Sequence, residues 1–336
     1  MSSALLEVED LRVHFGPCER PVRAVDGVSL SVAADSVVGL VGESGAGKSV
    51  VARTVIGLTA ATDATVTGRV LYAGRDLLSL PARELRRLRG PEIAIAFQDP
   101  LASLHPLRRV GVQVVEAVRA HRSVSRAGAR RRAAELLEMV GLADPERVAR
   151  SHPHELAGGA RQRVALAIAL AHEPRLLIAD EPTTALDVTV QAQILALLGR
   201  LRRELGMALL LITHDLGVVA ETAGEVAVMY AGKVVERGPA AEVFARPGHP
   251  YTWGLLRSVP RLDSEPHARL AAIPGRPPSP AAPPTGCRFH PRCAHVRDAH
   301  RRVDPPLEAV AGEPGHLVAC LLSPSERARL RGEGDP

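Results

Sequence analysis

The sequence contains few aromatic residues, few cysteines and no long apolar run. Phe, Trp and Tyr together make up 2% of its 336 residues, so aliphatic side chains must supply most of the core. A membrane-spanning helix needs about eighteen apolar residues in a row, and the longest runs here, Val164–Ala171 and Met207–Ile212, suit buried elements instead. The N-terminus becomes acidic within ten residues and has no basic flank, which argues against a secretory signal peptide. We therefore expect a cytoplasmic chain without a disulfide framework.

The chain is long enough for a large core, and its charge favours anionic partners. A length of 336 residues suggests one large domain with an appendage, or two domains. Hydrophobic residues make up 46%, which argues against global disorder. The formal net charge of +5 is modest for this length. It is compatible with nucleotides, anionic lipid headgroups or nucleic acid, and does not choose among them.

Apolar patterning predicts a mixed α/β fold. Residues 5–41 alternate apolar and polar positions between glycines and prolines, which is typical of short antiparallel strands. Residues 107–150 and 189–204 have the spacing of helices. Continuous apolar runs suited to buried strands lie at 36–41, 92–97, 175–180 and 207–213. Strand, helix and strand in this order predict a mostly parallel sheet with helices on its faces.

A glycine-rich stretch between a predicted strand and a predicted helix indicates a phosphate-binding loop. It reads "GESGAGKS" and fits the pattern G-x-x-x-x-G-K-[ST]. In such a loop the backbone amides point at phosphate oxygens, Lys48 reaches the β- and γ-phosphates, and the Ser49 hydroxyl suits Mg²⁺. The candidate nucleotide-binding residues here are Gly42, Glu43, Ser44, Gly45, Ala46, Gly47, Lys48, Ser49 and Val50.

An acidic pair ends another predicted strand, in "LLIADEPTTALD". The buried run before it delivers Asp180 and Glu181 to a carboxyl end of the sheet, the edge at which ligands bind in open α/β sheets. Asp180 can complete the Mg²⁺ shell and Glu181 can polarise the attacking water. The alternative is an exposed acidic pair at a strand end, which the phosphate loop disfavours because both strands should open onto the same edge.

Further stretches carry a family resemblance. "HELAGGARQRVALAIALA" at 154–171, "AFQDP" around Gln98 and "LITHD" around His214 occur with the two motifs above in a fixed order. Together they resemble the nucleotide-binding subunits of ATP-binding-cassette (ABC) transporters. The resemblance makes "LAGGA" the signature stretch, Gln98 the Q-loop glutamine, "TALD" the D-loop and His214 the switch histidine. Phe15 is the candidate for the aromatic residue on which adenine stacks.

Other stretches narrow the resemblance to one subfamily. "FQDPLASLHP", "HPHELAGGARQR", "VMYAGKVVERGP" and "RPGHPYTWGLL" are similar to the dipeptide, oligopeptide and nickel importer ATPases. This implies an α/β fold with a P-loop NTPase core and parallel sheet, an antiparallel β subdomain and a helical signature subdomain at about 100–160. We expect the cassette to span 5–258 and a small cysteine-containing extension to span 259–336. Its segment 273–285 is too rich in proline for a helix and suits a linker or an extended surface segment.

The resemblance also implies a mechanism and residue roles. Two cassettes close head to tail around two ATP molecules, each held by the phosphate loop of one subunit and the signature helix of the other. Gly158 and Gly159 leave room for that helix N-terminus to approach the γ-phosphate. Glu181 is then the general base, and His214 contacts the γ-phosphate. The remaining implied roles are Mg²⁺ coordination by Ser49, Gln98 and Asp180, and a place in the nucleotide site for Asp187.

The implied cofactors are ATP and Mg²⁺, and the implied partners lie at a membrane. They are a second ABC ATPase, usually a different chain in this subfamily, two integral membrane permease subunits and, indirectly, a solute-binding protein. The expected location is the cytoplasmic side of the cell membrane, as a peripheral subunit. No nucleic-acid partner is expected.

One residue departs from the family pattern. Where the signature usually has serine, this chain has Ala157. A hydroxyl donor to the γ-phosphate is lost, and a hydrogen bond to a charged group is worth about 1.5–3 kcal/mol. The backbone amides remain, so we expect weaker closure of this site rather than loss of function.

The C-terminal stretch "GCRFHPRCAHVRDAH" holds a cluster of cysteine and histidine residues. Cys18 stands apart near the start of the chain, and Cys287, Cys293 and Cys320 lie in the extension. The family pattern suggests a four-ligand iron–sulfur cluster, [4Fe-4S], with His300 in the place of the third cysteine. Three outcomes stay open: a Cys₃His iron–sulfur or zinc site, a tail that binds no metal, or disulfides. His290, His295 and His316 are expected to be ordinary surface histidines.

Two functions from different classes remain in competition. The first is the ATP-hydrolysing motor subunit of an ABC importer, for di- or oligopeptides or for nickel or another solute. The second is a soluble ABC ATPase that acts on nucleic acid. About 108 residues separate Lys48 from Leu156, which leaves no room for coiled-coil arms, and the chain lacks an aromatic and basic stacking surface. A simple P-loop kinase would have no use for "LAGG" or His214. The sequence does not name the solute.

Overall fold

A computed structural model describes residues 4–17, 19–59, 62–259, 272–310 and 313–333. Cys18 and residues 260–271, which belong to the predicted extension 259–336, lie outside this range. The chain divides into two compact units, each described separately. The first comprises Met1–Leu5, Val32–Ser36 and Leu77–Ile212, and the second comprises Leu6–Ser31, Val37–Asp76 and Thr213–Pro336.

The first unit contains three parallel strands in the order β8-β7-β6. Their bounds are Ile93–Ala96 for β6, Leu176–Asp180 for β7 and Ala208–Thr213 for β8. Ile93 pairs with Leu176, and Leu176 pairs with Ala208. Every residue of β7 and β8 is buried, as expected for parallel strands covered on both faces. The predicted parallel arrangement of these runs is confirmed.

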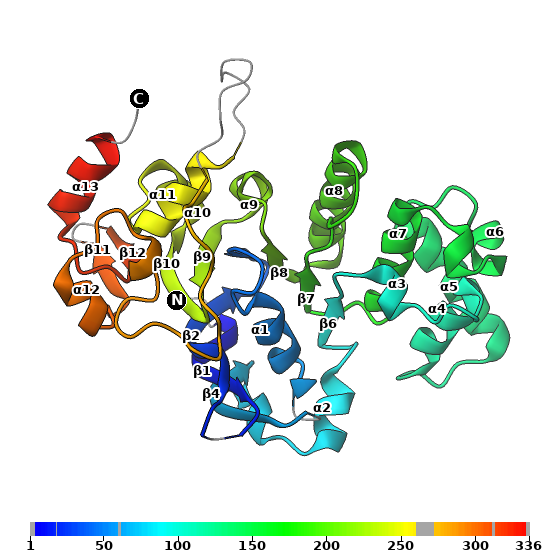
Figure 1. Ribbon diagram of the computed structural model, residues 1–336. Coiled ribbons are helices and arrows are strands. Elements are labelled where there is room, and N and C mark those ends of the chain that lie inside the picture. The colour runs from blue at the N-terminus through cyan, green and yellow to red at the C-terminus, as the bar shows by residue number, and fades with distance from the viewer. Residues whose placement is uncertain (1–3, 18, 60–61, 260–271, 311–312, 334–336) are drawn as a thin grey trace. The chain divides into compact units, whose positions relative to one another are not determined.

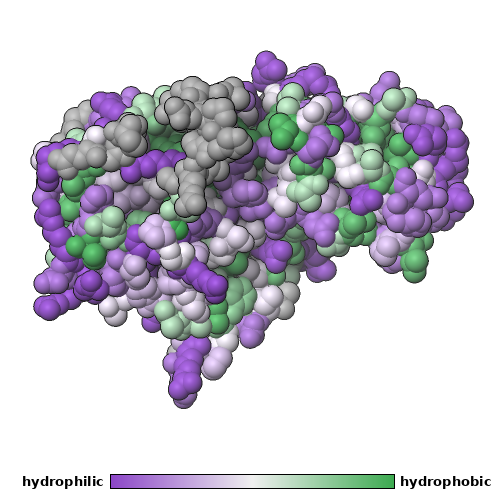
Figure 2. Space-filling model, turned by 45° about the horizontal axis from the view of Figure 1, so that its top comes forward, coloured by the Kyte–Doolittle hydropathy of each residue, from purple (hydrophilic) through white to green (hydrophobic). Residues whose placement is uncertain are grey.

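Helices make up most of the rest of the first unit (Figure 1). They are α2 (Ala82–Leu88), α3 (Pro100–Ser103), α4 (Val110–Arg119), α5 (Arg126–Met139), α6 (Pro145–Arg150), α7 (Gly158–Ala169) and α8 (Val188–Leu205). Side chains start several of them: Ser125 accepts from Gly128 N, Asp144 from Arg147 N and Asp187 from Val190 N. These caps satisfy amides that have no partner within the helix. Hydrophilic residues dominate the visible surface of this helical segment (Figure 2).

The second unit contains an antiparallel sheet in the order β2-β1-β4-β5. The strands are β1 (Ala4–Phe15), β2 (Val22–Ala33), β4 (Ala64–Tyr72) and β5 (Arg75–Asp76). Leu6 pairs with Tyr72 and Phe15 with Ala64, so the predicted antiparallel strands are confirmed. Alternate residues of β1 are buried, which is the pattern of a sheet with one covered face.

The second unit also contains the strand that precedes the phosphate loop. Strand β3 runs parallel to β9, and β9, β10, β12 and β11 continue in antiparallel order. Their bounds are Val37–Val41 for β3, Glu225–Tyr230 for β9, Lys233–Pro239 for β10, Glu308–Val310 for β11 and Glu313–Val318 for β12. The helices are α1 (Lys48–Val55), α9 (Leu216–Thr222), α10 (Ala240–Ala245), α11 (Pro250–Arg257), α12 (Asp298–Arg302) and α13 (Pro324–Glu333).

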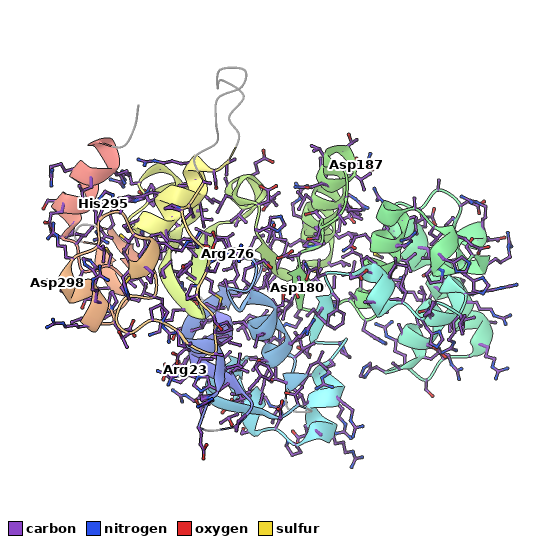
Figure 3. All side chains as sticks on the ribbon, in the orientation of Figure 1. Arg23, Asp180, Asp187, Arg276, His295 and Asp298 are labelled. Carbon is purple, nitrogen blue, oxygen red and sulfur yellow. The ribbon has the colours of Figure 1, made fainter. Side chains whose placement is uncertain are left out.

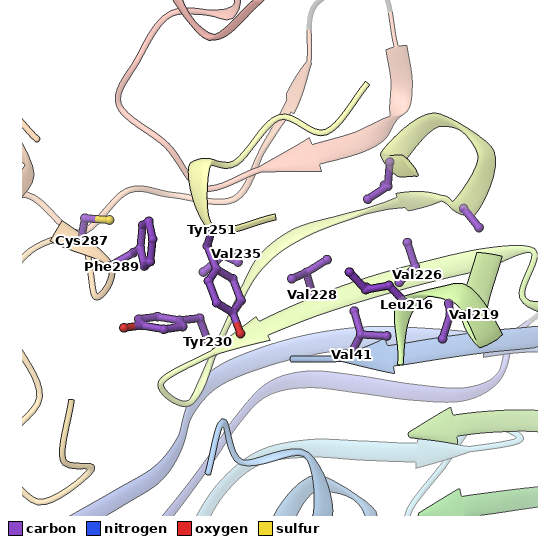
Figure 4. Close-up of a cluster of buried hydrophobic side chains, with 12 residues drawn as sticks. Val41, Leu216, Val219, Val226, Val228, Tyr230, Val235, Tyr251, Cys287 and Phe289 are labelled. Atoms are coloured by element: carbon purple, nitrogen blue, oxygen red, sulfur yellow. The ribbon is translucent and has the colours of Figure 1, made fainter. Parts of the chain in front are cut away.

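The C-terminal region contributes to the core of the second unit. Phe289 packs against Tyr230 and Tyr251, with ring centroids 5.2 and 5.4 Å apart (Figure 4). Cys287 belongs to the same buried cluster. The few aromatic residues of the chain are therefore concentrated where the extension meets β9 and α11. Burying such rings contributes much of the packing energy of a core.

The proline-rich segment is extended. Residues 272–285 contain no helix or strand, as predicted. The carbonyl of Pro280 accepts a hydrogen bond of 2.8 Å from the amide of Arg23, so the segment is attached to the start of β2. None of the described helices is both long and apolar enough to cross a membrane.

Candidate functional site

The phosphate loop connects β3 to α1 and is shaped by glycine. Gly42 and Gly47 have φ angles of 152° and 102°. A Cβ at Gly42 would lie 2.1 Å from the Met229 carbonyl oxygen, and one at Gly47 would lie 2.3 Å from that of Ala24. No other residue fits these two positions. The loop has therefore the backbone cradle that a polyphosphate requires.

Lys48 folds back over this loop. Its side chain is buried, and Nζ donates to the carbonyl oxygens of Gly42 at 2.8 Å and Glu43 at 3.1 Å. Gly47 caps α1 without a side-chain hydrogen bond, so no side chain of the cap occupies the helix N-terminus. An anion at this end is favoured by the helix dipole and the exposed amides. ATP with Mg²⁺ fits this cradle.

The predicted adenine and γ-phosphate contacts lie in the same unit as the loop. Phe15 is the last residue of β1 and is partly exposed, so its ring is accessible to a flat ligand. His214 follows β8 directly and is exposed, so it is not a core histidine. The next residue, Asp215, caps α9 by accepting from the amides of Gly217 and Val218.

The acidic pair lies at the carboxyl end of β7, as predicted (Figure 3). Asp180 and Glu181 are both buried, with 1% and 9% of their surface exposed, which excludes the alternative of an exposed acidic pair. Glu181 has a φ angle of 49°, a left-handed conformation that costs a non-glycine residue energy and that recurs at active sites. Its amide donates to the Ile212 carbonyl on β8 at 2.8 Å.

The Glu181 carboxylate is held by two donors. Gln98 Nε2 and Thr184 Oγ1 each donate to Oε2 at 2.9 Å. The sequence motifs place Gln98 and Glu181 in one site but assign no role to Thr184. The only sequence signal was its position three residues after Glu181, within the stretch interpreted as the D-loop. Tyr251 and Arg292, which contact the phosphate loop, lie in the stretches "RPGHPYTWGLL" and "GCRFHPRCAHVRDAH", but no motif predicts their contact with the loop.

The signature stretch starts α7. Ala157 is the N-cap residue and makes no side-chain hydrogen bond, and Gly158 and Gly159 form the first turn. A Cβ at Gly159 would lie 2.6 Å from Val190 Cγ1, whereas one at Gly158 would meet only Leu186 Cδ2 at 3.3 Å. Gly158 is exposed. The two glycines therefore differ: Gly159 allows α7 to pack on α8, and Gly158 leaves the helix N-terminus open.

Residues of the Q-loop, the signature stretch and the D-loop, all in the first unit, line one pocket of about 360 Å³. Its lining includes Gln98, Gly158 and Thr184. Asp187 lies near the start of α8, where Oδ1 accepts from the Val190 amide at 2.9 Å (Figure 3). Of the predicted site residues of this unit, Gln98 and Gly158 thus line one pocket, although they lie far apart in the sequence.

The cysteine and histidine cluster of the extension contains free thiols and one buried histidine. Cys287, Cys293 and Cys320 are free, and no group of three or more His, Cys, Asp or Glu side chains in the described residues is arranged to hold a metal ion. Burial raises the pKa of Cys287 to about 11 and raises the pKa values of the other two thiols, and the three thiols also act on one another. His300 is buried; Nδ1 accepts from the Arg297 amide at 3.0 Å, and Nε2 has no partner among the described residues.

One histidine of the extension was misjudged from the sequence. His316 was expected at the surface, but it is 1% exposed. It contacts Glu236 through Nε2 at 2.7 Å and Glu313 through Nδ1 at 2.9 Å. The pair of Glu236 and His316 joins β10 to β12, a relationship across 80 positions that no local pattern reveals. His290 and His295 are partly exposed.

The fold, phosphate loop and signature helix define an ATP-binding cassette, and comparison with known proteins agrees. The family model "ABC transporter" matches residues 25–184, and the model "Oligopeptide/dipeptide transporter, C-terminal region" matches residues 235–299. The chain belongs to the ATP-binding subunits of oligopeptide and dipeptide ABC transporters. It is therefore an ATPase coupled to transport.

Relatives match nearly the whole chain. A probable peptide ABC transporter ATP-binding protein of Sinorhizobium fredii is 50% identical over 95% of both chains. The oligopeptide transport ATP-binding protein OppD of Salmonella typhimurium is 48% identical over 95% of this chain and 94% of its own. The dipeptide transport protein DppD of Escherichia coli is 47% identical over 92% and 94%. A solved dimeric ATP-binding cassette in a post-hydrolysis state with ADP and Pi is 29% identical, with a TM-score of 0.63 over 70% of this chain and 98% of its own.

Proposed function

We propose that this chain is one of two ATPase subunits that drive an importer of di- or oligopeptides. The observation that carries this proposal is identity of 47–50% to peptide-transport subunits across both the cassette and the C-terminal region. The cassette of residues 5–258 supplies the motor, and the extension 259–336 is the part characteristic of peptide transporters. The subunit works as a peripheral protein on the cytoplasmic side of the membrane.

Each candidate site residue has a role in this proposal. Lys48 and the amides of the phosphate loop bind the β- and γ-phosphates, and Phe15 stacks on adenine. Ser49, Gln98 and Asp180 hold Mg²⁺, which neutralises charge on the phosphates. Glu181 orients and deprotonates the attacking water, a role supported by the two hydrogen bonds that fix its carboxylate. His214 contacts the γ-phosphate from its exposed position after β8.

A second ATPase copy completes each site. Gly158 and Gly159 present the N-terminus of α7 to the nucleotide of the partner, and Asp187 faces the same interface. Support comes from the exposure of this region: Gly158 and Asp187 are exposed, and Val188 beside Asp187 is 84% exposed. An interface with a second ATPase would cover this apolar side chain at the start of α8. We propose that the partner is a different ATPase chain.

The permease subunits dock on the segment that follows Gln98. Leu101, Leu107 and Val112 expose 46%, 82% and 44% of their surfaces within fifteen residues of Gln98. Such a group of exposed apolar side chains is typical of an interaction surface. Its position lets Gln98 link the docked permease to Mg²⁺ and Glu181. A solute-binding protein takes part indirectly, through the permease.

Transport assays with the complete importer test the proposed function. The two permeases, both ATPases and the solute-binding protein are reconstituted in vesicles, and uptake of labelled dipeptide, oligopeptide and Ni²⁺ is measured with and without ATP inside. We expect ATP-dependent peptide uptake that the Glu181→Gln variant abolishes. Uptake of Ni²⁺ alone would contradict the peptide assignment. ATPase activity stimulated by nucleic acid, but not by permeases, would contradict the transport function.

We also propose an iron–sulfur cluster as a separate function of the extension. Support comes from the mutual influence of the three thiols and from the buried Nε2 of His300 without a partner among the described residues. Each ligand of such a cluster binds a different iron, so the ligands need not converge on one point as they do around a single ion. The chain's ligands would be Cys287, Cys293, Cys320 and His300.

Metal analysis of the anaerobically purified complex tests this second proposal. We expect iron and acid-labile sulfide in the wild type and their loss in Cys293→Ser, with Cys18→Ser as the control that keeps them. Zinc without sulfide would indicate the zinc alternative. A wild type without either metal would contradict both.

A further inference from the structure

Arg292 in the C-terminal extension contacts the phosphate loop directly. Its guanidinium forms two parallel hydrogen bonds with the Glu43 carboxylate, from Nη1 to Oε2 at 2.7 Å and from Nη2 to Oε1 at 3.0 Å. The two residues are 249 positions apart. Glu43 is the second residue of the phosphate loop. A bidentate pair of this kind fixes orientation as well as charge.

The arginine cannot easily turn away from this contact. Its side chain is 5% exposed. Nε donates to the Pro274 carbonyl at 2.8 Å and Nη2 to the Ile273 carbonyl at 3.3 Å, both in the extended proline-rich segment. The guanidinium also lies 5.7 Å from the centre of the Tyr230 ring. Burial lowers the pKa of Arg292, but hydrogen bonds with Glu43 and Tyr230 outweigh it and raise the pKa, so the charge is permanent.

Every polar group of Glu43 has a partner. Its amide donates to Tyr251 Oη at 2.8 Å, its carbonyl accepts from Lys48 Nζ at 3.1 Å, and its carboxylate binds Arg292. Tyr251 is fully buried in α11. Glu43 therefore connects the phosphate-binding lysine on one side with the extension on the other. The extension belongs to the same compact unit as the loop.

We infer that Arg292 is a positioning residue for ATP binding, through which the C-terminal extension sets the shape and charge of the phosphate loop. A carboxylate at the start of this loop would repel a triphosphate, and Arg292 neutralises it where water screens little. The same contact holds the part of the phosphate loop that carries the Glu43 carbonyl, an acceptor for Lys48. This inference rests on the proposed ATP site. It assigns the extension the function of positioning the phosphate loop for ATP.

Steady-state kinetics of variants in the assembled transporter test the inference. In Arg292→Gln we expect KM for Mg-ATP to rise about tenfold or more, as for the loss of one charged hydrogen-bonded pair, with kcat little changed. Adding Glu43→Gln to this variant removes the unpaired charge, so KM should fall back toward the wild-type value. Arg292→Lys keeps the charge without the planar fork and should give an intermediate KM.

A matched control comes from the same extension. Arg297 forms an ion pair with Glu326 at 2.6 Å, away from the phosphate loop, and Arg297→Gln should leave KM unchanged. The inference is overturned if Arg297→Gln and Arg292→Gln raise KM alike, or if Glu43→Gln fails to restore KM in the Arg292 variant. Should Arg292→Gln not fold, the comparison of Arg292→Lys with its Glu43→Gln double variant decides in the same way. If the wild type itself does not bind Mg-ATP, the proposed function fails instead.

Discussion

Gln98 donates a hydrogen bond of 2.9 Å to the carboxylate of Glu181, although 83 positions separate the two residues. Thr184 donates to the same oxygen, so Oε2 of Glu181 accepts two hydrogen bonds that fix the orientation of the carboxylate. A preorganised base does not have to reorient during the reaction, which is how enzymes lower the barrier of such steps.

Glu181→Gln should nearly abolish ATP hydrolysis while ATP still binds. The amide keeps the shape of the side chain but cannot take a proton from water, and general-base catalysis contributes about 10²–10⁴-fold. The measurement is ATPase activity of the complete complex, with nucleotide retention as the second readout. An ATPase rate within about threefold of the wild-type rate would show that another group is the base.

Thr184→Val tests the part of the hydroxyl in holding Glu181. The replacement is similar in shape and removes one donor to Oε2, so we expect a smaller loss of kcat, about tenfold, as for one hydrogen bond to a charged group. Thr183→Val, at the buried neighbouring position, is the control for packing. Equal losses in both variants would mean that packing, not the hydrogen bond, matters here.

Ala157→Ser should improve the signature helix in two separable ways. A serine N-cap accepts from an amide of the first turn and should raise the free energy of unfolding by about 1 kcal/mol. The hydroxyl can also donate to the γ-phosphate, which should raise ATPase activity. Ala157→Gly provides the comparison without a hydroxyl. Unfolding followed by circular dichroism measures the first effect. If only stability increases and ATPase stays at the wild-type level, the alanine does not limit closure.

Gly158→Ala and Gly159→Ala should impair different properties, dimer formation in the first variant and stability in the second. At Gly159 the new methyl group would overlap Val190, which should lower the free energy of unfolding by about 1–3 kcal/mol. At Gly158 it meets only the flexible tip of Leu186, so stability should stay the same while ATP-dependent dimer formation weakens. Calorimetry and size-exclusion chromatography with Mg-ATP separate the two. A Gly158→Ala protein that dimerises normally would argue against close approach at this residue.

The contact of His316 with Glu236 should make stability depend on pH. Burial alone lowers the pKa of His316, but hydrogen bonds and charges of Glu236 and Glu313 outweigh it, so the pKa is raised above its ordinary value of 6.5. A raised folded-state pKa means that the stabilisation is complete below pH 6.5 and is lost as the pH rises through the folded-state value.

His316→Gln provides the measurement. Below pH 6.5 the variant should be less stable than the wild type by about 3 kcal/mol, because one partner of a buried ion pair is missing. The difference in thermal midpoint between the two proteins should shrink as the pH increases. His290→Gln, at a partly exposed position of the same extension, should show no such trend. A difference that grows with pH would mean that His316 is neutral in the folded protein.

Several parts of the fold and site could be predicted from the sequence because they are local. The phosphate loop, the acidic strand end and the signature helix each depend on neighbouring residues, whose backbone geometry and apolar spacing are fixed within about one turn or one strand. Glycine at positions 42 and 47 is an example, since the loop conformation itself requires it. Their order along the chain then indicated the family.

Other features depend on which distant segments meet. Whether Arg292 contacts Glu43 and whether His316 is buried beside Glu236 cannot be read from spacing. The sequence does not reveal whether an arginine or histidine side chain is surrounded by water or paired with a carboxylate. The sequence by itself determined an ATPase cassette with a phosphate loop, because local backbone chemistry specifies that loop. Only the tertiary structure decided that the extension touches the loop, because burial and pairing of side chains 249 positions apart arise when the chain packs.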